Sequence, residues 1–176
     1  IFLVSFAIFC LSVMPVFAAT VESGETYWQG PDKTVEGNLY ISFGNIDISG
    51  KVDGDLVAIG GNILITGEVT GDVLAAGGSV DIWGKVGGDI RAAGGRVFVG
   101  NDVGGDVLAA GGMVQVRPNV HVGGDVILAG GAVFATGMIA GDVRAAGGTV
   151  LVAGDIGGNA TIYSEEPTIA EPTRIA

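Results

Sequence analysis

A Gly-Asp dipeptide recurs with a 17-residue period through most of this chain. Boundaries set at this dipeptide, which is Gly-Asn in the first case, divide residues 37–157 into seven units. Six units have the length of this period and the fifth, residues 105–123, is longer by two. The unit at 71–87 reads GDVLAAGGSVDIWGKVG. Self-similarity at a fixed period predicts stacked structural repeats, each of which buries its apolar residues against its neighbours.

The side-chain pattern within a unit shows which positions face inward. Position 3 is always Leu, Val or Ile, whereas position 4 varies and includes Arg91 and Arg144. Successive residues of a strand face opposite sides, so the variable position is the outer one. Positions 3, 5, 10, 12 and 16 are therefore predicted to form five inward ladders. In the unit at 71–87 the large inward residues are Val73, Val80, Ile82 and Val86.

This pattern predicts an all-β fold, a single-stranded parallel β-helix with about 17 residues per coil and seven to eight coils. We expect three short strands per coil, with coils about 4.8 Å apart. Glycine pairs such as Gly77-Gly78 and Gly87-Gly88 fall between the strands, where we expect corners with positive φ. The β-helix should span residues 37–163. Residues 19–36 should be an N-terminal cap, or the segment by which the chain enters the solenoid, and 164–176 a truncated further coil.

Residues 1–18 are almost wholly apolar. Val16 and Ala18 supply the small residues that precede a signal-peptidase cut, here ahead of Ala19, so the segment is typical of a secretory signal. An uncleaved membrane anchor is the alternative, since this length is at the short end of a bilayer span. Either reading predicts a protein that is exported or membrane-associated. The only cysteine, Cys10, lies in this segment, so we expect no disulfide in the mature fold.

The Asp at position 2 forms the most regular row of polar side chains. The six carboxylates are metal-ligand candidates: Asp55, Asp72, Asp89, Asp106, Asp125 and Asp142. A calcium-binding β-roll would need a second row of ligands, which the repeat lacks. We expect instead that each carboxylate accepts hydrogen bonds from backbone N–H groups of its own glycine corner.

Position 15 carries alternating charges, Lys51, Glu68, Lys85 and Asp102, which we expect to help the stacking of coils. The only histidine, His121, lies in the two-residue expansion of the fifth unit, without a second ionisable group nearby in the pattern. We interpret it as a solvated side chain rather than a general base. We therefore expect no catalytic residue and no enzymatic activity.

Charge and sequence pattern limit the classes of molecule that this chain is expected to bind. The formal net charge of −11 disfavours nucleic acid, which requires clustered cations. The glycines recur as corners and lack the lysine of a phosphate-binding loop, so no cofactor and no small-molecule substrate is expected. Outer positions 4 and 6 form a flat strip of small and apolar residues, with self-association candidates Leu74, Ala76, Ala93, Leu108 and Ala110. Such strips usually mark contact surfaces, although ordinary scattered exposure is the alternative.

The aligned units read G-D-[LVI]-x-A-x-G-G-x-V-x-I-x-G-x-V-x-G-D. This cadence, clear over residues 37–163 and looser over 164–176, resembles that of the bactofilins and related polymer-forming cytoskeletal proteins of bacteria. The resemblance implies a right-handed, three-faced β-helix that polymerises end to end, without nucleotide, into membrane-associated filaments. It carries over no nucleotide or metal site.

The apolar segment at 1–18 departs from that family, whose typical members are cytoplasmic and begin with a short polar tail. The chain is therefore similar to an exported or membrane-bound relative. We expect a self-assembling scaffold, a homopolymer or oligomer, at the bacterial cell envelope. The alternative is an exported binding module, such as an adhesin stalk or a glycan-binding rod. An aromatic-rich or Ser/Thr-rich face would favour that alternative, whereas an Ala-rich apolar strip favours self-association.

Overall fold

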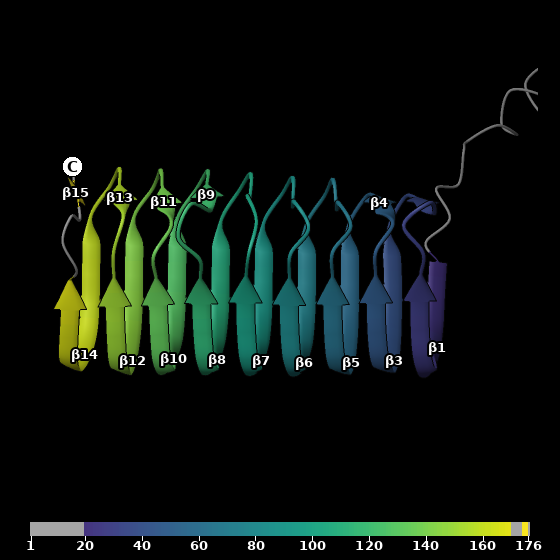
Figure 1. Ribbon diagram of the computed structural model, residues 1–176, viewed down its shortest axis with the longest axis horizontal. Helices are drawn as coiled ribbons and strands as arrows, with labels where there is room; N and C mark the ends of the chain where they lie inside the picture. The colour runs from purple at the N-terminus through teal and green to yellow at the C-terminus, as the bar shows by residue number, and fades with distance from the viewer. Residues whose placement is uncertain (1–19, 170–173, 176) are drawn as a thin grey trace, which may run out of the picture.

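The computed structural model describes residues 20–169 and 174–175. They form an all-β solenoid of about eight turns, in which parallel strands stack along one axis (Figure 1). The predicted secretory signal or anchor at 1–18, with Cys10, lies outside the described residues. Within the described ranges, no helix is long and apolar enough to cross a membrane.

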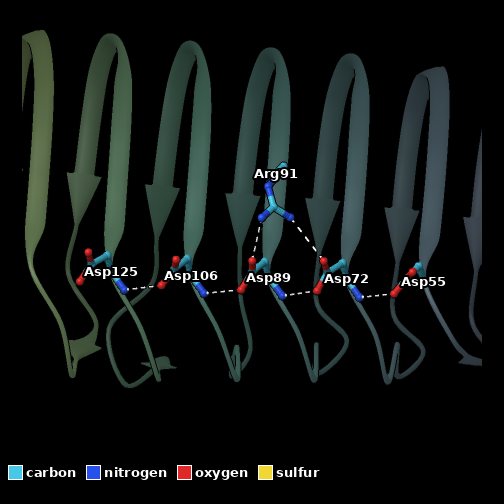
Figure 2. Close-up of polar contacts among 6 residues, drawn as sticks. All are labelled: Asp55, Asp72, Asp89, Arg91, Asp106 and Asp125. Atoms are coloured by element: carbon cyan, nitrogen blue, oxygen red, sulfur yellow. Dashed lines mark hydrogen bonds and ion pairs between the residues drawn. The ribbon is translucent and has the colours of Figure 1, made fainter.

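Each coil contributes one ten-residue strand to a nine-stranded parallel sheet. In sheet order these strands are β1 (Thr20–Gln29), β3 (Leu39–Ile48), β5 (Leu56–Ile65), β6 (Val73–Ile82), β7 (Ile90–Val99), β8 (Val107–Val116), β10 (Val126–Ala135), β12 (Val143–Val152) and β14 (Ala160–Ile169). Each strand bends over near its middle, as the arched ribbons of Figure 2 show, and so covers two faces of the coil. The structure thus has one bent strand where the sequence suggested two short ones.

The third face of the coil is narrower. Its short strands are β2 (Thr34–Glu36), β4 (Lys51–Asp53), β9 (His121–Val122), β11 (Met138–Ile139), β13 (Asp155–Ile156) and β15 (Arg174–Ile175). β2 pairs with β4, and β9, β11, β13 and β15 form a second small sheet. Between these sheets the third face consists of isolated parallel bridges, such as Val69 to Val86. The inward ladder at position 16 therefore continues through the coils whose third face has no strand.

The register confirms the repeat. Val73 lies opposite Ile90, its equivalent in the next unit, and across the expanded coil Val107 lies opposite Val126. The two extra residues fall in the corner after β8, where Asn119 has a φ of 67°. The inward positions on both sides of that corner stay in register.

Burial confirms the predicted parity of the strands. In β6, Val73 and Val80 are fully buried, whereas Leu74 between them is 50% exposed. Val86 on the third face is also fully buried. One continuous cluster of such residues runs from Leu39 to Ile156. Because each buried Val or Ile contributes about 1.5–3 kcal/mol of transfer free energy, these ladders hold the coils together.

The predicted positive φ at the glycine corners is wrong for Gly77-Gly78 and Gly87-Gly88. Among the described glycines, only Gly37 (85°) and Gly154 (111°) have positive φ. The reason for glycine at these corners is instead the lack of room for a side chain between neighbouring coils. A Cβ on Gly78 would lie 2.9 Å from the carbonyl oxygen of Gly61 in the preceding coil. The close stacking of the coils, rather than a left-handed backbone, excludes a side chain there.

Residues 20–36 fold as a further coil, although they lack the sequence repeat. β1 pairs in register with β3, and β2 with β4. Its inward positions are more polar than those of the other coils, because Tyr27 and Gln29 align with Ile46 and Ile48, although Val35 aligns with Val52. Buried Gln29 donates from Nε2 to the carbonyl oxygens of Lys33 (3.1 Å) and Lys51 (3.0 Å). This polar coil covers one end of the aliphatic core.

Candidate functional site

The row of Asp residues at position 2 forms a hydrogen-bonded ladder along the solenoid (Figure 2). The backbone N–H of each Asp donates to Oδ1 of the Asp in the preceding coil, at 2.7–2.9 Å. Asn38 accepts from Asp55 at one end, and Asp142 accepts from Asn159 at the other. The sequence prediction was correct in expecting backbone donors, but the donor belongs to the next coil rather than to the residue's own corner.

Arginines neutralise part of this ladder. Arg91 reaches Oδ2 of Asp89 at 2.8 Å and Oδ2 of Asp72 at 3.4 Å, as drawn in Figure 2. Arg144 lies 3.5 Å from Oδ2 of Asp142. The backbone N–H of Asn159 holds the pKa of Asp142 below its usual range. The Oδ1 atoms are therefore engaged in linking coils, and no cluster of three His, Cys, Asp or Glu suited to a metal ion occurs among the described residues.

The predicted strip at positions 4 and 6 is exposed. Ile59 is 55% exposed and Leu108 48%, and Ile127 continues the row. Ala76, Ala93 and Ala110 lie opposite one another on β6, β7 and β8 and are exposed. Arg91 lies between Leu74 and Leu108, but its two carboxylate partners hold the guanidinium toward the ladder. The strip therefore presents mainly aliphatic and methyl groups.

A second cluster of outer apolar residues lies on the face formed by the second halves of the long strands. The rings of Trp83 and Phe98 are 4.7 Å apart, and the guanidinium of Arg117 lies 5.2 Å from the centroid of Trp83. Gly100 makes room for the two rings, since a Cβ there would lie 2.8 Å from Trp83. The aromatic residues sit in adjacent coils, a pairing that the period of the repeat could have indicated.

The third face carries a groove of about 500 Å³ that includes His121, Lys85, Asp102, Met138 and Asp155 in its lining. The absence of an ionisable neighbour, inferred from the sequence, is wrong for His121. Oδ1 of Asp102 accepts its backbone N–H at 2.9 Å and lies 3.3 Å from Nδ1. The backbone hydrogen bond is the main cause that lowers the pKa of Asp102. Aligning the coils across the expansion would have brought these two residues together.

The alternating charges at position 15 pair differently from expectation. Lys51 lies 3.4 Å from Asp53 of its own coil, and Asp102 pairs with His121 of the next coil. Within the described ranges no ion pair joins Lys51 to Glu68. Lys85 and Asp102 line the groove, and Lys85 helps to lower the pKa of Asp102, as expected of opposite charges on neighbouring coils. Among the described residues the column does not form a continuous row of ion pairs.

Comparisons with protein-family models, with curated proteins and with solved structures found no match for this chain.

Proposed function

We propose that this chain is a non-enzymatic structural protein, a scaffold that associates with copies of itself at the bacterial cell envelope. The observation that carries the proposal is the strip of exposed aliphatic residues, including Ile59, Leu74, Leu108 and Ile127, on a flat parallel sheet. Contiguous apolar surface on a soluble protein usually marks a contact site. A second copy offers the same flat surface, so two strips can cover each other.

Two further features support a structural role. The coils pair in register along one axis and bury a continuous aliphatic core, as expected of a rod. The repeat also resembles that of polymer-forming bacterial proteins over residues 37–163. The location at the envelope rests on the apolar segment at 1–18 and on its reading as a secretory signal or anchor.

Charged variants of the strip test the proposal. Arg91 and Arg144 show that position 4 accepts arginine, so Leu74→Arg with Leu108→Arg should preserve the fold. In residues 19–176, this double variant should shift sedimentation from oligomer to monomer. The matched control is Leu64→Arg, which alters a leucine that is 37% exposed on the second face. Oligomers that persist in the double variant, or an equal loss in the control, would refute association through the strip.

The exposed aromatic cluster favours a second candidate function, an exported binding rod. Trp83 and Phe98 offer ring surface of the kind that sugars or peptides pack against, and Arg117 adds hydrogen-bond donors. A glycan array probed with residues 19–176 and with Trp83→Ala tests this candidate. Binding that Trp83→Ala abolishes would favour the rod, and a lack of binding to all glycans would count against it.

A further inference from the structure

The groove on the third face brings a nitrogen donor and a sulfur donor together. β9 and β11 are parallel neighbours, with His121 opposite Met138. Opposed residues on neighbouring strands are about 5 Å apart and their side chains emerge on the same face. Both side chains line the groove. Solvent can reach them, since His121 is exposed and Met138 is half-buried. The imidazole and the thioether therefore leave adjacent coils in the same direction.

Asp102 prepares the imidazole of His121 to act as a ligand. Its Oδ1 lies 3.3 Å from Nδ1, and the same oxygen accepts the backbone N–H of His121 at 2.9 Å. A carboxylate at Nδ1 favours the tautomer with the proton on Nδ1, so Nε2 keeps its lone pair. Histidines that bind metals usually have such a carboxylate or carbonyl partner on the second ring nitrogen.

The charges and chemistry of the groove favour a cation over a reacting substrate. Its charged lining residues other than His121 are one lysine, Lys85, and two carboxylates, Asp102 and Asp155, so carboxylates outnumber lysine in the groove. Among the described residues that line it, none carries a hydroxyl or thiol that the Asp–His pair could activate as a nucleophile. Besides the imidazole nitrogen of His121, the lining offers the thioether sulfur of Met138 and the carboxylate of Asp155, and the sulfur is the donor that favours a soft ion.

We propose that Nε2 of His121 and Sδ of Met138 bind one soft monovalent ion, Cu(I), with Asp102 as the positioning residue. Thioether sulfur selects Cu(I) over hard cations, and imidazole suits copper. Cu(I) also accepts low coordination numbers, which matches a site with two protein donors. The site lies on a different face from the apolar strip, so it stands independently of self-association.

Ag(I), a redox-inert ion with the same ligand preference, is the first probe. The full chain carries Cys10→Ser, because a free thiol would bind the same ions, and is kept in a mild detergent and chloride-free buffer. Calorimetry should show one equivalent of Ag(I) bound. In NMR spectra the ε-methyl of Met138 and the ring of His121, the only histidine, should shift together. Anaerobic competition with a coloured Cu(I) chelator then measures Cu(I) affinity.

Variants assign the donors. Met138→Leu keeps the volume of the side chain and removes the sulfur, and it should weaken Ag(I) binding by more than about tenfold, as should His121→Gln. Asp102→Asn can still accept the backbone N–H and should weaken binding by about 10-fold while changing the tautomer in the ¹⁵N spectrum of His121. The control Met113→Leu alters an exposed methionine on another face and should bind as the parent does.

Several results would overturn the proposal. One is that the folded parent shows no saturable binding of Ag(I) or Cu(I). Another is that Met138→Leu or His121→Gln, each folded by circular dichroism, binds as tightly as the parent. A third is that Zn(II) binds as tightly as Cu(I) and is unaffected by Met138→Leu, since that pattern describes a site without a sulfur ligand.

Discussion

At the scale of single residues, the Gly-Asp dipeptide acts as one device that joins neighbouring coils. Oδ1 of Asp55 accepts the N–H of Asp72 at 2.9 Å, and the carboxylate passes over Gly71 to reach it. A Cβ on Gly71 would meet that carboxylate and would lie 2.8 Å from the carbonyl carbon of Gly54. Glycine leaves the space that the aspartate crosses, so the two residues recur together.

Substitutions of Asp55 separate its hydrogen bond from its charge. Asp55→Ala leaves the N–H of Asp72 without this acceptor and should lower the free energy of unfolding by about 1 kcal/mol. Asp55→Asn keeps an acceptor, as Asn38 does in the preceding coil, and should change it by less than about 0.5 kcal/mol. Urea unfolding monitored by circular dichroism measures both. Equal losses in the two variants would show that charge matters and the hydrogen bond does not.

The lowered pKa values of Asp102 and Asp142 predict how stability depends on pH. Because folding favours their ionised forms, their contribution is present above about pH 4, the ordinary range of an aspartate. It is lost as the pH falls through the folded pKa values, since the unfolded chain then binds more protons. The midpoint temperature of thermal unfolding should fall as the pH is lowered below about 4. The fall should be less steep in the double variant Asp102→Asn with Asp142→Asn. Identical slopes would contradict this assignment.

At the scale of strands and corners, the inward ladders follow from periodicity alone. Alternation at Val73 and Leu74 is a local property of an extended chain, so the sequence predicts it well. The corners depend on the distance between coils. The positive φ predicted for Gly78 was wrong because the need for glycine there comes from crowding by Gly61, a tertiary effect.

Two details of the structure could not be seen in the repeat pattern, for related reasons. The coil at 20–36 was hidden because polar Gln29 occupies an inward position. The contact of His121 with Asp102 was missed because the two-residue expansion lies between their positions in the repeat. In both cases the strands stay paired in register although the sequence pattern is interrupted, since backbone pairing tolerates a polar side chain and a longer corner.

Neighbouring residues of β8 provide a matched test of the parity. Val114 is fully buried. Val114→Asp should lower the free energy of unfolding by about 3 kcal/mol, because it buries a carboxylate without a partner. Met113 is exposed on the same strand, and Met113→Asp should cost less than about 1 kcal/mol. Chemical unfolding gives both values. If Met113→Asp were the more damaging change, the inward ladder would be wrongly placed.

At the scale of the whole molecule, the surfaces of the rod differ in what they can bind. The polar coil at 20–36 covers one end of the core, and Tyr27 packs there against Phe43 with ring centroids 5.3 Å apart. The first face is apolar around Leu74 and Leu108, and the third face has a charged groove. The proposed lateral contact through the first face would bury apolar surface and leave the polar coil and the groove undisturbed.

Light scattering of residues 19–176, over a range of protein concentrations at moderate salt and without nucleotide, tests self-association most directly. Removing residues 1–18 ensures that this apolar segment does not cause the association. We expect the weight-average mass to rise with concentration beyond that of a monomer, because apolar strips would cover one another. A mass that stays at the monomer value up to the highest concentration would contradict the scaffold proposal and favour the binding rod.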